Sequence, residues 1–119
     1  MTSVLLVEDS EIMRSAIKCL LNTDPEIQLL AEAINLREAI DLTKNLHPEV
    51  VILDLHLGDE GSILPSTVKS SFVGCRIVAM SFANDREVKE IAERFGAAIL
   101  LDKMTLASDL IPAIKRYPQ

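Results

Sequence analysis

The chain has 119 residues, of which 49% are hydrophobic and 3% aromatic, and its formal net charge at pH 7 is −6. This length is typical of one domain, so we expect residues 1–119 to form a single unit with a substantial core. The negative charge and the scarcity of aromatic residues exclude the usual means of holding phosphate backbones and bases. We therefore expect this chain itself to bind no nucleic acid.

No apolar segment is long enough to span a membrane, and the N-terminal residues lack the basic region of a signal peptide. We therefore expect a cytoplasmic protein without membrane contact. Cys19 and Cys75 stand far apart in apolar surroundings, which favours two reduced, buried thiols over a disulfide or a metal site.

An apolar run at residues 4–7 predicts the first strand, and it ends in two carboxylates, Glu8 and Asp9. Ser10 is suited to cap a following helix. Apolar residues at helical spacing predict the inner face of that helix, which consists of Ile12, Met13, Ala16, Ile17, Leu20 and Leu21.

Residues 28–33 predict a second strand. Asn35, followed three positions later by Glu38, resembles a capping box, so we expect a second helix to begin there. Its apolar repeat continues until Pro48, which ends the helix because proline cannot donate a backbone hydrogen bond.

The run at residues 50–53 predicts a third strand that is buried on both faces, and it ends abruptly in Asp54. An ionised carboxylate beside so apolar a strand is costly unless it has partners. The rest of the chain must therefore supply partners for Asp54. A third helix is expected between Gly61 and Gly74, although several serines there favour a helix less.

Two further strands are expected at residues 77–80 and 98–101. The first ends at Ser81, and the second is closely followed by Lys103. Apolar residues at helical spacing predict helices after both strands, at residues 88–95 and 106–114.

Strand and helix thus alternate five times, which predicts an α/β fold with a doubly wound parallel sheet and helices on both faces. The carboxyl ends of parallel strands meet at one edge of the sheet. We therefore expect five residues from distant parts of the chain to converge: Glu8, Asp9, Asp54, Ser81 and Lys103.

The chemistry of these side chains indicates phosphoryl transfer. Neighbouring carboxylates repel one another and need a cation, and oxygen ligands suit Mg²⁺. A carboxylate can accept a phosphoryl group, whose transfer requires positioning and charge neutralisation by a metal, a lysine and a hydroxyl donor. Glu8, Asp9, Ser81 and Lys103 supply those parts, with Asp54 as the acceptor.

The chain resembles, over essentially its whole length, the receiver domain of two-component response regulators, of the chemotaxis type. The resemblance rests on Val7-Glu8-Asp9, on Ile52-Leu53-Asp54, on Ser81 and on Lys103. It implies a single-domain, flavodoxin-like (βα)5 fold with strand order 2-1-3-4-5.

The resemblance also implies a role for each site residue. Asp54 accepts a phosphoryl group from a phosphohistidine of a sensor histidine kinase or phosphotransfer protein. Mg²⁺ is held by Glu8, Asp9, Asp54 and the backbone carbonyl of His56. Ser81 and Lys103 bind the phosphoryl group, and an output partner binds the surface of the fourth helix, fifth strand and fifth helix, with a homodimer as a further possibility.

Four positions depart from the family pattern. Gly58 stands where a proline usually follows the acceptor, and Met104 stands where a proline usually follows the lysine. Phe82 replaces a small residue, and we expect it to narrow access to Asp54 and slow phosphorylation, dephosphorylation or both. Leu100 replaces the aromatic residue that normally turns inward as the serine or threonine moves, so another element must report the phosphoryl group.

Three classes of function remain compatible with these residues. The first is a phosphoacceptor switch with slow self-dephosphorylation, which is not an enzyme in the ordinary sense and can be the receiver portion of a longer DNA-binding regulator. The second is a degenerate receiver that acts only as an interaction module. The third, an Asp-x-Asp phosphatase or a flavin protein, is disfavoured because Asp54-Leu55-His56 lacks the second carboxylate and no glycine-rich loop follows the first strand.

Overall fold

The computed structural model describes residues 1–58, 60–83 and 85–116. The strands are β1 (Thr2–Val7), β2 (Ile27–Ala33), β3 (Val50–Asp54), β4 (Arg76–Ser81) and β5 (Ile99–Asp102). The helices are α1 (Glu11–Leu21), α2 (Leu36–Leu46), α3 (Pro65–Ser71), α4 (Arg86–Phe95) and α5 (Leu106–Arg116). Short 3₁₀ turns lie at Glu60–Ser62 and Lys103–Thr105.

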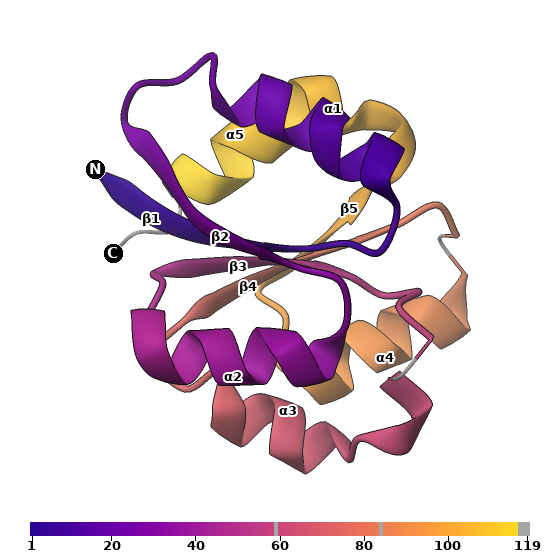
Figure 1. The fold of residues 1–119 in the computed structure, drawn as a ribbon. Coiled ribbons are helices and arrows are strands. Elements are labelled where there is room, and N and C mark those ends of the chain that lie inside the picture. Colours follow the sequence, from indigo (N-terminus) through magenta and orange to yellow (C-terminus); the bar gives the residue numbers. More distant parts are fainter. Residues whose placement is uncertain (59, 84, 117–119) are drawn as a thin grey trace.

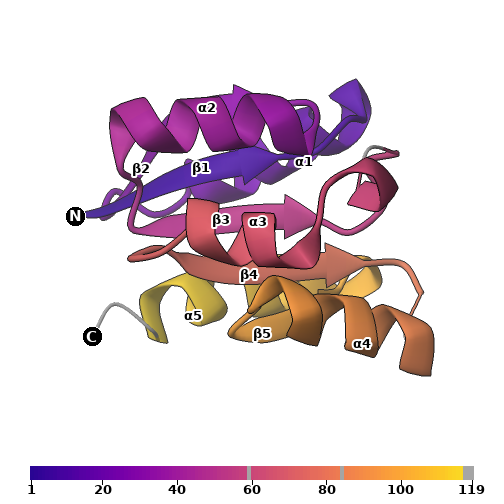
Figure 2. The same cartoon turned by 90° about the horizontal axis from the view of Figure 1, so that it is seen from below.

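The strands form one parallel sheet in the order β2-β1-β3-β4-β5. Helices α1 and α5 cover one face of the sheet, and α2, α3 and α4 cover the other (Figure 1). Seen from below, the arrowheads of β1, β3 and β4 point towards the same edge of the sheet (Figure 2). The predicted doubly wound, flavodoxin-like fold and its strand order are therefore confirmed.

Local capping explains why the first two predicted helices begin where they do. The Ser10 side chain accepts a hydrogen bond from the backbone N–H of Met13 at 3.2 Å. The Asn35 side chain accepts one from the N–H of Glu38 at 2.8 Å, and the Glu38 carboxylate in turn accepts from the N–H of Ile34. Each cap satisfies donors that a helix end leaves unpaired.

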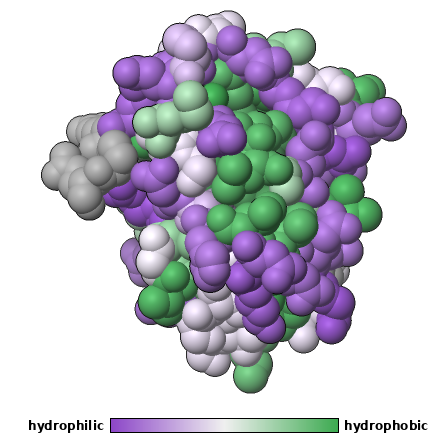
Figure 3. Space-filling model, turned by 60° about the vertical axis from the view of Figure 1, so that its left-hand side comes forward, coloured by the Kyte–Doolittle hydropathy of each residue, from purple (hydrophilic) through white to green (hydrophobic). Residues whose placement is uncertain are grey.

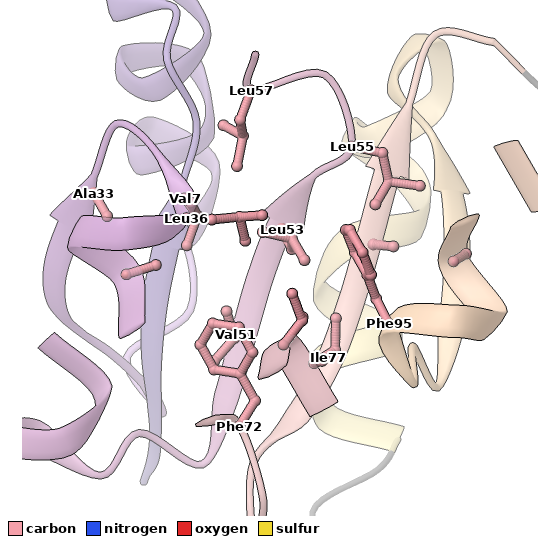
Figure 4. Close-up of a cluster of buried hydrophobic side chains, with 14 of the residues drawn as sticks. Val7, Ala33, Leu36, Val51, Leu53, Leu55, Leu57, Phe72, Ile77 and Phe95 are labelled. Atoms are coloured by element: carbon pink, nitrogen blue, oxygen red, sulfur yellow. The ribbon is translucent and has the colours of Figure 1, made fainter. Parts of the chain in front are cut away.

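Strand β3 lies at the centre of the core, and its residues 50–53 have no exposed surface. Successive side chains of a strand point to opposite faces of the sheet. Val51 and Leu53 accordingly pack with Phe72 and Phe95 beneath α2, α3 and α4 (Figure 4). Ile52 packs on the other side, against α1 and α5.

Two expectations about α1 were wrong. Ile12, placed on the inner face, is 82% exposed, and Ala16 is exposed as well. Cys19, expected to be a buried thiol, is also exposed. At about 100° per residue, Ile12 lies about 140° and Cys19 about 160° around the helix from the buried Ile17, so the stripe that reaches the core is narrower than the sequence suggested.

Part of the surface remains hydrophobic. Strand β2 is an edge of the sheet, and its apolar residues are mostly half-buried. Figure 3 shows hydrophobic side chains gathered in the middle of the face that it displays, between hydrophilic ones.

Among the described residues, no helix is long and apolar enough to cross a membrane.

Candidate functional site

The carboxyl edge of the sheet brings together four side chains from distant parts of the chain. Glu8 follows β1, Asp54 ends β3, Ser81 ends β4 and Lys103 follows β5. Glu8, Asp54 and Ser81 are 1%, 2% and 1% exposed, and the Lys103 side chain is 4% exposed. The fold thus concentrates charged and polar groups at a place where water is largely excluded.

Lys103 lies between the two buried carboxylates. Its Nζ is 2.7 Å from Oε1 of Glu8 and 3.0 Å from Oδ1 of Asp54. Burial disfavours the charged ammonium, but the hydrogen bonds and charges of Glu8 and Asp54 outweigh this effect and raise the pKa of Lys103. Lys103 therefore stays protonated at neutral pH and compensates negative charge that would otherwise be buried alone.

Three carboxylates meet at the same edge. Glu8, Asp9 and Asp54 each offer an oxygen, and these oxygens lie within 4.8 Å of one another. Asp9 is exposed, whereas the other two are buried, so the cluster is open to solvent on one side. Oxygen ligands with an open, hydrated side fit Mg²⁺, which prefers a few carboxylates and retains several waters.

Sequence reasoning did not identify Arg14, whose side chain holds the loop of Glu8 and Asp9 in place through contacts with that loop and with β2. Its Nη1 donates to the backbone carbonyl of Glu8 at 2.9 Å, and its Nε lies 3.4 Å from a carboxylate oxygen of Glu32 on β2. The backbone N–H of Ser10 also donates to the Glu8 carboxylate at 3.2 Å. One signal could have identified this residue, because Arg14 lies in the first turn of α1, close to the acidic end of β1.

The loop after Asp54 turns back towards the acceptor. The backbone N–H of His56 donates to Oδ1 of Asp54 at 3.1 Å. Gly58 adopts φ +92°, which only glycine reaches without strain. Proline is locked near −65°, so a proline at this position would require another path for the loop. No described contact involves the His56 carbonyl, and its part in holding a metal stays a prediction.

Ser81 and its neighbour Phe82 close the site on the β4 side. Oγ of Ser81 accepts a hydrogen bond from the backbone N–H of Ala83 at 3.0 Å and lies 2.8 Å from Nε2 of His56. Phe82 is 56% exposed, and its ring centre lies 5.2 Å from Nζ of Lys103, within cation–π range. Sequence reasoning did not foresee the contact between His56 and Ser81.

Nearly the whole chain matches the model of one known protein family. The family model described as the response regulator receiver domain matches residues 4–115. The chain therefore belongs to the response regulator receiver domain family, as its sequence motifs indicated.

Particular relatives agree with this assignment. The nitrate/nitrite response regulator protein NarL of Escherichia coli K12 is 30% identical over 113 residues, which are 94% of this chain and 52% of NarL. The response regulator domain of Thermotoga maritima CheB has the same fold, with a TM-score of 0.84 and 21% identity over 99% of this chain and 96% of that chain.

A solved response regulator protein from Burkholderia pseudomallei is also similar, with a TM-score of 0.75 and 20% identity over 96% of this chain and 66% of that chain. This similarity, too, establishes the fold. The chain spans about half the length, or less, of the curated relatives that it matches first.

Proposed function

We propose that the chain is a phosphoacceptor switch. Asp54 takes a phosphoryl group from a phosphohistidine of a sensor histidine kinase or phosphotransfer protein, and the product changes which partner the chain binds. The observation that carries this proposal is the buried contact of Lys103 with Asp54 and Glu8 at the carboxyl edge of the sheet. A lysine held there is placed to pair with the oxygens of a group attached to Asp54.

Each residue has one role in the proposed phosphoryl transfer. A carboxylate oxygen of Asp54 forms the new bond to phosphorus, while the phosphorus–nitrogen bond breaks and the nitrogen keeps the electron pair. Lys103 pairs with the phosphoryl charge, and Ser81 donates its hydroxyl hydrogen to a phosphoryl oxygen.

The acidic cluster belongs to the same proposal. Glu8, Asp9 and Asp54 would hold Mg²⁺ together with the backbone carbonyl of His56, and the ion supplies charge neutralisation to the transferred group. The Burkholderia structure supports this assignment, because it is described with a phosphorylated aspartic acid and a calcium ion.

The partner or further domain that the proposed switch controls is inferred from similar proteins. NarL is about twice as long as the matched region, which supports the alternative that this sequence is the receiver portion of a longer regulator. We propose that such a regulator would bind DNA through the remaining part. In either case we propose that the partner binds the surface formed by α4, β5 and α5.

Incubation with Mg²⁺ and acetyl phosphate, a small phosphodonor, tests the proposed function. We expect the intact protein to gain the mass of one phosphoryl group and the Asp54→Asn variant to gain none. Asp41→Asn, which changes an exposed carboxylate on α2, is the matched control and should gain the group like the parent. A folded parent that remains unmodified would instead favour the degenerate interaction module.

Replacing Phe82 by alanine is expected to shorten the lifetime of the phosphorylated form. The ring centre lies 5.2 Å from Nζ of Lys103, where it would hinder water from reaching a phosphorylated Asp54, so we expect dephosphorylation to be about 2- to 5-fold faster without it, a factor that corresponds to roughly 0.5–1 kcal/mol. The decay of the purified phosphoprotein measures this rate. Met104→Ala removes another exposed side chain next to Lys103 and serves as the control. Equal lifetimes for Phe82→Ala and the parent would rule out a shielding role for the ring.

A further inference from the structure

The ring of His56 contacts a residue of the site, although the proposed transfer uses only its backbone. Nε2 of His56 lies 2.8 Å from Oγ of Ser81, which is a hydrogen-bond distance. Ser81 is 1% exposed, so water has little access to its hydroxyl group. The imidazole is therefore a principal partner of the hydroxyl group that the phosphoryl group would need.

In the tautomer whose Nε2 carries no hydrogen, the hydrogen-bonding capacity of Ser81 makes the His56 imidazole and a phosphoryl group compete for the hydroxyl hydrogen. A serine hydroxyl has one hydrogen and two lone pairs, and the N–H of Ala83 already occupies one lone pair. A hydroxyl that donates to Nε2 of His56 has no hydrogen left. A phosphoryl oxygen can only accept, so it must take that same hydrogen from the imidazole.

We propose that Nε2 of His56, a positioning residue, accepts the hydrogen of the Ser81 hydroxyl while Asp54 is a free carboxylate, and that His56 releases this hydroxyl when Asp54 is phosphorylated. This inference rests on the proposed function. It adds that His56 lowers the rate at which Asp54 is phosphorylated. Breaking the bond between His56 and Ser81 opposes phosphorylation, and the freed ring changes the surface beside the acceptor.

Two features make His56 suitable as the moving part. The residue is exposed, so a released imidazole can be solvated at once, and its backbone N–H donates to Asp54 in the unmodified protein. Leu100, in the position of the family's moving aromatic ring, is packed against the core and has no hydrogen-bonding group. His56 therefore offers a way to report the phosphoryl group that Leu100 cannot.

Phosphorylation rates of His56 variants test the inference. With acetyl phosphate and Mg²⁺, the donor's bond between phosphorus and the acyl oxygen breaks, acetate leaves, and the phosphoryl group passes to Asp54. We expect His56→Ala to react about 2- to 10-fold faster than the parent, the factor that corresponds to one net hydrogen bond. His56→Gln, whose amide oxygen can accept from Ser81, should stay close to the parent.

His47→Asn is the matched control, because it removes the other histidine at an exposed left-handed position that asparagine tolerates. It should react like the parent. A His56→Ala rate equal to or below that of the parent would overturn the inference, since the ring would then be idle or would assist the transfer. A parent that takes up no phosphoryl group would instead refute the proposed function itself.

Nitrogen NMR of the His56 ring provides a readout independent of rate. In the unmodified protein we expect Nε2 to be unprotonated and hydrogen-bonded, and Ser81→Ala should shift its signal. Beryllofluoride, a phosphoryl mimic, should shift the same signal in the parent and leave it unchanged in Asp54→Asn. A ring signal that stays constant when beryllofluoride binds the parent would show that Ser81 keeps His56, contrary to the inference.

Discussion

Replacing Lys103 by alanine is expected to lower the free energy of unfolding by about 3–5 kcal/mol in the absence of divalent cations, the usual cost of removing one partner of a buried ion pair. The ammonium lies between Glu8 and Asp54, and both carboxylates are almost fully buried. Without it, two like charges face each other where little water reaches them. Urea denaturation in the presence of a chelator measures the loss.

Mg²⁺ should stabilise the Lys103→Ala variant more than the parent, because a cation held by Glu8, Asp9 and Asp54 would replace part of the missing charge. Phosphorylation should nevertheless remain slow, by about 100- to 1,000-fold, the usual effect of losing one group that stabilises a transition-state charge. The two measurements together separate the structural role of Lys103 from its role in transfer.

Lys115→Ala is the matched control for Lys103→Ala. Lys115 also contacts two carboxylates, Asp24 at 3.0 Å and Glu26 at 2.7 Å, but on the surface of the protein. Exposed ion pairs are screened by water and salt, so the control should lose far less stability. Equal losses in the two variants would contradict the argument that burial makes the Lys103 contacts strong.

The contribution of Lys103 should also depend on pH in a defined direction. Its pKa is raised in the folded state, so the folded protein holds this proton more tightly than the unfolded chain. The stabilisation is complete below the ordinary lysine pKa and is lost as pH rises through the raised value. The stability difference between parent and Lys103→Ala should therefore persist at neutral pH and shrink only at strongly alkaline pH.

Replacing Leu53 by alanine is expected to lower the free energy of unfolding by about 2–5 kcal/mol, because it leaves a cavity in a closely packed core. Leu53 has no exposed surface, and it lies on the central strand directly before Asp54 (Figure 4). Chemical denaturation measures the change. A protein of this size has only about 5–15 kcal/mol in total, so the variant should be visibly less stable to heat.

Leu64→Ala makes the same chemical change at a residue that is 69% exposed, and it should alter stability by less than about 0.5 kcal/mol. If Leu53→Ala cost no more than this control, the cluster around β3 would not be the main core. The folded fraction of Leu53→Ala should still accept a phosphoryl group, since Leu53 points away from the charged edge into the apolar cluster.

Much of the candidate site could be predicted because it depends on strand ends. Apolar runs locate parallel strands, and the residue that follows each run must lie on the carboxyl edge whatever the details of packing. Asp54 and Lys103 are almost fifty positions apart in sequence. They nevertheless meet at 3.0 Å because β3, β4 and β5 are neighbours in one sheet.

The amino-acid sequence alone determined the alternation of elements, the parallel sheet and the set of polar residues at its carboxyl edge, because periodicity and strand ends are local properties of the chain. Three further features are visible only in the folded molecule: Ile12 faces solvent, Arg14 donates to the Glu8 carbonyl, and the His56 ring reaches Ser81. These depend on how far a helix rotates against the sheet and on the path of the loop around Gly58, which follow from the packing of the whole molecule.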